Sequence, residues 1–179
     1  IGCKINVSGR KIIIKRNHNK KKKIVHKIIF DRIEAGTYLI AGALSGKKVT
    51  LKKIIPKVMK CEINVLKKMG VSILVNKNTI TILKTKRLKK ISISTKPFPS
   101  FPTDLQAQLM VLMTQAYGVS KIKENIFENR FMHVPELKRM GAKIEIKNKT
   151  AYIIGPSKLT GAEVMATDLR ASVSLVLAG

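Results

Sequence analysis

The feature that most constrains how this chain can fold is an internal repeat of about 70 residues. Glycine turns at Gly2, Gly70 and Gly141 are 68 and 71 residues apart, and two short β-prone segments follow each of them. Alternation and turn composition predict a hairpin for each pair of segments. The three pairs are residues 4–7 with 11–15, 72–75 with 79–83, and 143–147 with 150–154.

A second landmark recurs with a similar period, namely an aspartate followed by a run of Ala, Leu, Met and small residues. The three aspartates of the chain, Asp31, Asp104 and Asp168, are 73 and 64 residues apart. The run after each aspartate, for example residues 105–116, is apolar on nearly all sides. Each run therefore predicts a helix that is buried over most of its surface.

The stretch between each buried helix and the next glycine turn predicts one more strand and one more helix. Segments 47–51 and 120–123 are the predicted strands, and segments 58–69 and 134–140 are the predicted helices. The unit is thus βαβαββ, and the chain holds about two and a half copies of it. These patterns predict an α/β (α+β) fold in which a mixed sheet is covered by buried helices.

The strong positive charge is weak evidence for nucleic-acid binding. The formal net charge is +26, but 29 of the 36 basic residues are Lys and only 7 are Arg. Together with 24 Ile residues, this is the bias that AT-rich coding sequence produces, whereas nucleic-acid binders tend to enrich Arg. Lysines occur along the whole chain, and the one dense run, residues 20–23, is predicted to be a solvated loop. We therefore expect no specific nucleic-acid binding, only a general attraction for polyanions.

Several other classes lose support from the sequence. No apolar run reaches the roughly 18–20 residues of a membrane span, so no membrane partner is expected. Cys3 and Cys61 lie too far apart for a disulfide framework or a thiolate zinc site, and no metal or cofactor motif occurs. The chain starts at Ile1 and its last residues, 175–179, are apolar, which leads us to expect a clipped segment of a longer protein.

Two roles are open for each aspartate at a helix start. The common one is an N-cap that accepts hydrogen bonds from the first free N–H groups. The alternative is a general base, and Asp104 suits this role because a proline-rich loop would hold it in a fixed position. Segment 124–134 mixes acids, amides, an Arg, two Phe and a His, and is either a polar loop or a functional segment. His133 alone is expected to be structural, whereas Arg170 could face an anion at a helix N-terminus.

Three blocks of the sequence together resemble the UDP-N-acetylglucosamine 1-carboxyvinyltransferase family of enolpyruvyl transferases. They are FPTDLQAQ at 101–108, FENRFMHVPEL at 127–137 and MATDLRAS at 165–172. The resemblance covers essentially the whole chain. It implies an inside-out α/β barrel of two lobes, each with three βαβαββ units, of which this chain has about two and a half of the six. Residues 1–29 would be the tail of the first lobe, and residues 30–179 most of the second.

The resemblance also implies a reaction and a place for it. Phosphoenolpyruvate would donate its enolpyruvyl group to the 3′-hydroxyl of UDP-N-acetylglucosamine, and phosphate would leave. This is the first committed step of peptidoglycan synthesis, in the bacterial cytoplasm, and it needs no cofactor. The family's motifs assign catalytic roles to Asp104, as the base at the sugar hydroxyl, and to Asp168, an acid beside the reacting centre. They assign substrate binding to Asp104, Ile126, Phe127 and Arg130 for the sugar nucleotide, and to Arg170 for phosphoenolpyruvate.

Part of the machinery implied by the resemblance has no counterpart here. The family's proton-donor cysteine belongs to a loop of the other lobe, and neither Cys3 nor Cys61 matches it. The 179 residues alone are therefore expected to be inactive and to need the remaining half of the polypeptide to complete the cleft. Two alternatives remain open. They are the sibling 3-phosphoshikimate 1-carboxyvinyltransferase, against which blocks 101–108 and 127–137 weigh, and a non-catalytic basic remnant that binds polyanions.

Overall fold

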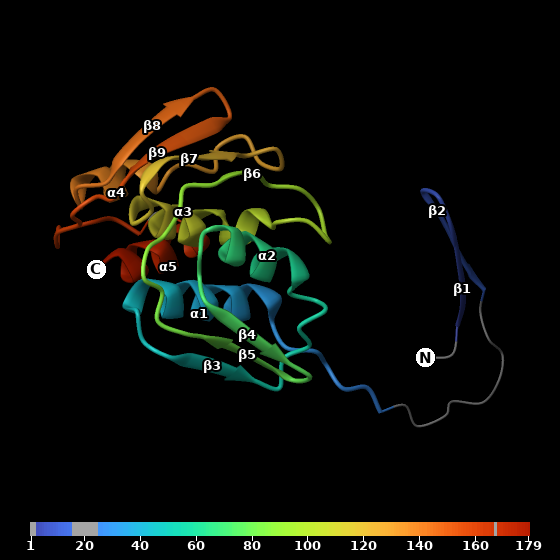
Figure 1. Ribbon diagram of the computed structural model, residues 1–179. Coiled ribbons are helices and arrows are strands. Elements are labelled where there is room, and N and C mark those ends of the chain that lie inside the picture. Colours follow the sequence, from blue (N-terminus) through green and yellow to red (C-terminus); the bar gives the residue numbers. More distant parts are fainter. Residues whose placement is uncertain (1–2, 16–24, 167) are drawn as a thin grey trace.

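The body of the molecule is layered, with two β-sheets on opposite sides of a group of buried helices (Figure 1). Helix α1 (Arg32–Ser45) packs on one sheet, and α3 (Gln106–Thr114) packs on the other. Helix α3 also contacts α1 and α5 (Leu169–Ala178), so it lies at the centre of the layers. The computed structural model describes residues 3–15, 25–166 and 168–179.

The two sheets differ in their topology. The first is antiparallel in the order β3-β5-β4, and the second has the order β6-β7-β9-β8, with β6 and β7 parallel and the other pairs antiparallel. The predicted mixed sheet is thus confirmed, and within the described ranges neither sheet closes into a barrel. The strands are β3 (Val49–Lys52), β4 (Ile73–Asn76), β5 (Thr79–Ile82), β6 (Ser92–Ser94), β7 (Gly118–Lys123), β8 (Lys143–Lys147) and β9 (Thr150–Gly155). The remaining helices are α2 (Lys60–Lys68), the 3₁₀ turn η1 (Thr103–Leu105) and α4 (Val134–Arg139).

The middle copy of the repeat has every element of the predicted βαβαββ unit, in the order β6, α3, β7, α4, β8 and β9. The first copy differs, because residues 25–31 enter α1 without forming the expected strand. Val25 and Ile28 are exposed there, and no strand of the described chain pairs with them. Residues 156–166 likewise reach the third copy without a strand. An opening strand needs a neighbour for its backbone hydrogen bonds, and among the residues that the structure describes, β6 is the opening strand that finds one, in β7.

The N-terminal hairpin is a two-stranded sheet of its own. Strands β1 (Lys4–Ser8) and β2 (Lys11–Lys15) pair antiparallel, which confirms the predicted hairpin. Every residue of both strands is exposed, so this hairpin adds nothing to the core. The lobe boundary between residues 29 and 30 stays a prediction. The lysine run 20–23 lies outside the described residues.

The core is centred on α3, whose nine residues are all buried. This confirms the buried helix predicted after Asp104. A helix that is apolar on nearly every side must be covered on every side, and here α1, α5 and the second sheet cover it. Gly36 allows α1 to approach closely, because a Cβ at that position would overlap the side chain of Leu105. The largest fully buried side chains are Leu39, Met59, Met69, Ile80, Ile82, Leu105, Leu109, Met110, Leu112, Met113, Ile122 and Leu137.

The cap of α1 gives a first testable prediction. The Oδ1 of Asp31 accepts hydrogen bonds from the N–H groups of Ile33 at 2.7 Å and Glu34 at 3.1 Å, as predicted for an N-cap. Asp31→Ala should therefore lower the free energy of unfolding by about 1 kcal/mol, measured by urea titration. Asp31→Asn should stay close to the parent protein, because an asparagine oxygen caps equally well. Equal losses in the two variants would show that the cap bond is not what stabilises this end of α1.

Candidate functional site

The site forms where the loop after β6 enters α3. Three prolines, Pro97, Pro99 and Pro102, lie in this loop, and Pro102 is extended immediately before the turn η1. Leu105 is fully buried beneath the turn and anchors it to the core. Asp104 lies between them with a side chain that is 37% exposed. A short, anchored and proline-limited turn thus presents one carboxylate to solvent.

An ion pair between Arg32 of α1 and Glu62 of α2 also holds the loop between β6 and η1. The Nη2 of Arg32 donates to the carbonyl oxygen of Ser100 at 2.8 Å and lies 2.6 Å from Oε1 of Glu62. The guanidinium group also lies over the ring of Phe98, with Cζ 5.0 Å from the ring centroid. Burial raises the pKa of the Glu62 carboxyl, and the charge of Arg32 opposes that rise. Arg32 therefore connects α1 and α2 to the loop that leads to Asp104.

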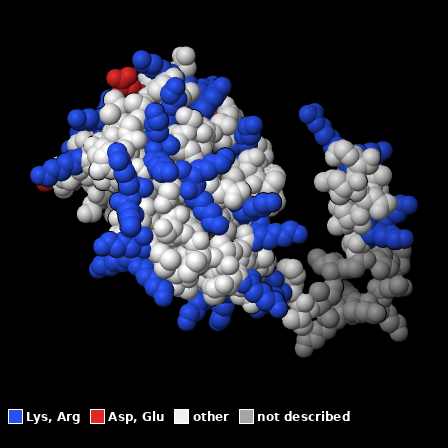
Figure 2. All heavy atoms as spheres, in the orientation of Figure 1, with Lys and Arg blue, Asp and Glu red and all other residues white. Residues whose placement is uncertain are grey.

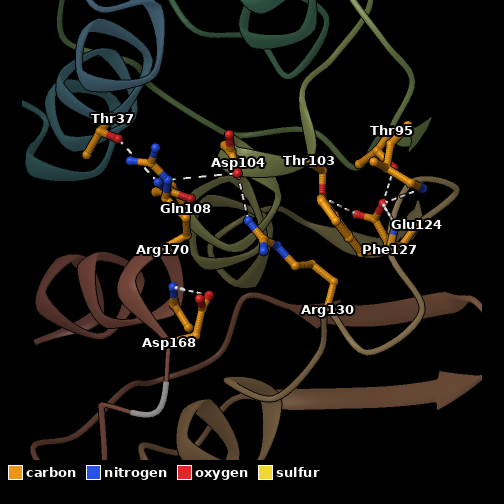
Figure 3. Close-up of polar contacts among 12 residues, drawn as sticks. Thr37, Thr95, Thr103, Asp104, Gln108, Glu124, Phe127, Arg130, Asp168 and Arg170 are labelled. Carbon is orange, nitrogen blue, oxygen red and sulfur yellow. Dashed lines mark hydrogen bonds and ion pairs between the residues drawn. The ribbon is translucent and has the colours of Figure 1, made fainter.

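Asp104 is not a helix cap, so the common expectation for an aspartate at a helix start is wrong here. Helix α3 begins at Gln106, and its N-cap residue is Leu105, which makes no side-chain cap bond. Instead, Oδ1 of Asp104 accepts a hydrogen bond from Nη2 of Arg130 at 2.7 Å. The Nε of Arg170 lies 3.8 Å from the same oxygen. Figure 3 shows Asp104 between these two arginines, which come from different parts of the chain.

Arg130, Phe127 and Ile126 all belong to the loop that follows β7. The guanidinium group of Arg130 lies over the ring of Phe127, with Cζ 5.1 Å from the ring centroid. The Phe127 side chain is otherwise half exposed. The N–H of Ile126 donates to Oε1 of Glu124 at 2.8 Å, so a backbone contact from Ile126 to a ligand would come from its carbonyl oxygen. Of these three residues, Arg130 contacts Asp104 directly and Phe127 stacks against Arg130. Their roles with a substrate stay predictions.

Asp168 and Arg170 open helix α5. Asp168 is the N-cap, and its Oδ2 accepts a hydrogen bond from the N–H of Ala171 at 3.1 Å. Its carboxylate is turned to its own helix in Figure 3, while Arg170 reaches toward Asp104. The role of Asp168 beside a reacting centre stays a prediction. The guanidinium groups of Arg130 and Arg170 present N–H donors of the kind that bind carboxylate or phosphate oxygens.

Two glutamines in the first turn of α3 were not identified from the sequence. The Nε2 of Gln108 donates to Oγ1 of Thr37 on α1 at 3.3 Å. Its Oε1 and both amide atoms of Gln106 are buried without a hydrogen-bond partner in the described part of the chain. The signal that could have found them is the pair of amides directly after Asp104 in an otherwise apolar helix. Gln108 connects the start of α3 to α1 through its bond to Thr37.

Glu124, the last site residue that sequence reasoning missed, begins the segment 124–134. It follows β7 directly and is 1% exposed. Its two carboxylate oxygens accept hydrogen bonds from Thr95, Thr103, Ile126 and Phe127. The segment is therefore a loop that Glu124 holds together, with Phe131 packed against the core and Phe127 half exposed. Its functional role stays a prediction.

His133 is buried at the start of α4, and its Nε2 has no partner among the described residues. Burial lowers its pKa to about 4; the Asp168 charge opposes this and the Arg130 charge adds to it. An unfolded histidine has a pKa near 6.5, so between those values the unfolded chain binds more protons. The contribution to stability is therefore complete above about pH 6.5 and is lost as the pH falls to about 4.

This titration gives a second prediction. Lowering the pH from 7 to 4 should remove on the order of 3 kcal/mol of stability through His133. Urea titrations at pH 7, 5.5 and 4 would measure it, with His133→Gln as the reference because glutamine does not titrate. The variant should lose less stability over this range than the parent protein. Parallel curves for the two proteins would show that His133 is protonated equally in the folded and unfolded states.

The two cysteines are not among the residues that surround Asp104. Cys3 is exposed and Cys61 is half-buried, and both are free thiols. Burial is the main cause that raises the pKa of the Cys61 thiol, which makes it a poor nucleophile. Within the described ranges, no three His, Cys, Asp or Glu side chains lie close enough together to hold a metal ion. None of the helices described has both the length and the apolar character that a bilayer span requires.

The basic residues are distributed as the sequence suggested. Figure 2 shows Lys and Arg spread over the visible face, with few Asp or Glu between them. An even spread does not mark a docking patch on that face. Its expected effect is a general attraction for anions, including small anionic substrates.

Comparison with known proteins gives one consistent family. The family described as EPSP synthase (3-phosphoshikimate 1-carboxyvinyltransferase) matches residues 1–179. A UDP-N-acetylglucosamine 1-carboxyvinyltransferase from Pelagibacter ubique is 52% identical over 99% of this chain and 43% of its own length. A protein of the same name from Halothermothrix orenii is 49% identical over 100% of this chain and 43% of its own length. The chain thus spans less than half the length of the curated relatives that it matches.

Solved structures agree with the fold. The enolpyruvyl transferase NikO from Streptomyces tendae superposes with a TM-score of 0.82 at 27% identity, covering 99% of this chain and 43% of that one. An EPSP synthase from Acinetobacter baumannii gives a TM-score of 0.73 at 20% identity, covering 99% of this chain and 45% of that one. The second likeness shows the shared fold alone. The first supports the mixed α/β repeats described above.

Proposed function

Because the chain belongs to the EPSP synthase family, we propose that its full-length protein transfers the enolpyruvyl group of phosphoenolpyruvate to the 3′-hydroxyl of UDP-N-acetylglucosamine. The observation that carries the proposal is the exposed Asp104 carboxylate between Arg130 and Arg170, in a chain about half identical to enzymes of that name. The product would enter peptidoglycan synthesis, and the reaction would take place in the bacterial cytoplasm.

The proposed chemistry assigns Asp104 to the proton of the sugar hydroxyl. As that O–H bond breaks, the hydroxyl oxygen bonds to C2 of phosphoenolpyruvate, and a proton adds to C3. The bond from C2 to the phosphate oxygen then breaks, and C3 loses a proton to restore the double bond. The hydroxyl proton needs an acceptor within hydrogen-bond reach, and the Asp104 side chain, which is 37% exposed and does not cap a helix, could serve as one. The donor of the C3 proton would come from the remaining half of the polypeptide.

The arginines supply charge for the two anionic substrates. A guanidinium group binds carboxylate and phosphate oxygens through paired N–H groups, which a lysine cannot match. Arg170 would bind phosphoenolpyruvate, and Arg130 with Phe127 would border the sugar-nucleotide side. Both arginines already contact Asp104, so a bound substrate would share them with the base. The net charge of +26 would also speed the arrival of anions at low salt.

The sibling reaction on shikimate 3-phosphate is the other candidate, because it shares the family and the phosphoenolpyruvate donor. The curated relatives at about 50% identity favour the sugar nucleotide. The decisive experiment is phosphate release by the full-length protein with phosphoenolpyruvate and either acceptor. Release that requires UDP-N-acetylglucosamine supports the proposal, and release with shikimate 3-phosphate alone supports the sibling. No release with either acceptor would overturn the enzymatic proposal and favour a polyanion-binding remnant.

A further inference from the structure

The buried carboxylate of Glu124 connects the two sides of the site. It lies at the end of β7, where its own N–H donates to the carbonyl oxygen of Lys149 at 2.8 Å. Because Glu124 is 1% exposed, it is not placed to touch a substrate. A charge-bearing group is buried at this depth only when it has hydrogen-bond partners. Its partners therefore show what it does.

One oxygen of Glu124 holds the segment that carries Asp104. The Oγ1 of Thr103 donates to Oε2 of Glu124 at 2.9 Å. Thr103 is the first residue of the turn η1, and Asp104 follows it directly. The position of the Asp104 backbone is thus fixed on one side by Leu105 in the core and on the other by Glu124.

The other oxygen of Glu124 holds the loop that carries Ile126 and Phe127. Oε1 accepts from Thr95 Oγ1 at 2.7 Å, and from the N–H groups of Ile126 at 2.8 Å and Phe127 at 3.3 Å. Thr95 Oγ1 in turn accepts from the N–H of Asn125 at 3.0 Å. Three donors thus bond to Oε1 and one bonds to Oε2, so both carboxylate oxygens are held by protein groups. Because Glu124 is buried behind these donors, a ligand does not reach it, which separates its role from those of Asp104 and the arginines.

These contacts form a closed circuit around the site (Figure 3). From Glu124 it runs through Thr103 to Asp104, and the ion pair continues it to Arg130. The stacking of Arg130 over Phe127, and the N–H of Phe127, return it to Glu124. A closed circuit fixes the distance between its members more firmly than any single contact. The base and the loop of the sugar-nucleotide residues therefore share one reference point.

We propose that Glu124 is a positioning residue, which sets Asp104 through Thr103 and sets the loop 126–130 through Thr95 and two backbone N–H groups. The inference rests on the proposed function, because it takes Asp104 as the base. A displacement of about 1 Å in such a group can cost about a hundredfold in rate. Loss of the Thr103 contact should therefore reduce kcat, and loss of the Thr95 contact should raise KM for the sugar nucleotide.

The test uses the full-length protein and threonine-to-valine changes, which keep the shape and remove one hydroxyl. Thr103→Val should lower kcat by about 10- to 100-fold with little change in KM. Thr103→Ser, which retains the hydroxyl, should keep most of the activity. Thr95→Val should mainly raise KM for UDP-N-acetylglucosamine. The matched control is Thr50→Val, since the Thr50 hydroxyl bonds with that of Thr81 at 3.0 Å in the other sheet.

A double variant separates positioning from general stability. If Thr103 acts through Asp104, then Thr103→Val should have almost no further effect on kcat once Asp104→Asn is present. Additive losses would overturn the inference, as would a Thr103→Val enzyme as active as the Thr50→Val control. In both cases the parent enzyme still turns over, so the proposed function stands. A parent protein that releases no phosphate would instead overturn the proposed function and this inference with it.

Discussion

Asp104→Asn in the full-length protein should lower kcat by about 10²- to 10⁴-fold without disturbing the fold. Asparagine keeps the size of the side chain and can still accept a hydrogen bond from Arg130. It removes the negative charge and the group that takes the proton from the sugar hydroxyl. Because Asp104 does not cap α3, its loss costs no helix-terminal hydrogen bond. The steady-state rate of phosphate release at saturating substrates is the measurement.

The matched control for this change is Asp31→Asn. Asp31 is also an aspartate directly before a helix, but its Oδ1 caps α1 and contacts no arginine in the described chain. Its amide variant should keep full activity. An Asp104→Asn enzyme within threefold of the parent protein would show that another group accepts the hydroxyl proton. Asp168 would then be the first residue to change, because it is the other aspartate of the site.

The hairpins and buried helices could be predicted from sequence because their signals are local. Alternation over four to six residues identified β4 with β5 and β8 with β9, and glycine turns marked where these hairpins begin. The nine buried residues of α3 gave an apolar run that only a central helix can bury. The opening strand of each copy could not be predicted in this way, since a strand depends on a neighbour supplied by another part of the chain.

The three aspartates show where local reasoning stops. Asp31 and Asp168 cap their helices, because their side chains meet the free N–H groups of the turn that follows. Asp104 has the same position relative to an apolar run, yet it lies within a 3₁₀ turn that precedes α3, and its carboxylate bonds to Arg130 and not to the helix. Its partner Arg130 is 26 residues away in sequence. Spacing along the chain contains no information about that contact.

The family resemblance grouped residues of the site that spacing along the chain could not group, but it did not identify all of them. It placed Asp104, Phe127 and Arg130 in one cleft, and the structure brings these three side chains together. Their roles with substrate stay predictions. It gave no role to Glu124, whose four partners come from three separate segments of the chain. A buried polar group of this kind can be found only once the fold has brought its donors together.

Gly155→Ala should destabilise the protein by about 3 kcal/mol, the largest stability change expected from a single methyl group in this chain. Gly155 ends β9 against the last turn of α3. A Cβ there would lie 2.7 Å from the carbonyl oxygen of Thr114 and 3.0 Å from that of Met113, and it would overlap the carbonyl oxygen of Ala116. These are backbone atoms, so no side-chain rotation can relieve the contacts. Urea titration would measure the change.

The added methyl group should also weaken a neighbouring hydrogen bond, because the backbone just after Gly155 bonds to the end of α3. The N–H of Ser157 donates to the carbonyl oxygen of Thr114 at 2.7 Å, and any shift that accommodates the new methyl group would lengthen this bond. Gly161→Ala is the matched control, since a Cβ at Gly161 meets no atom within 4 Å. It should change the free energy of unfolding by less than about 0.5 kcal/mol. Similar losses at the two glycines would show that the close approach of β9 to α3 is not the cause of the destabilisation.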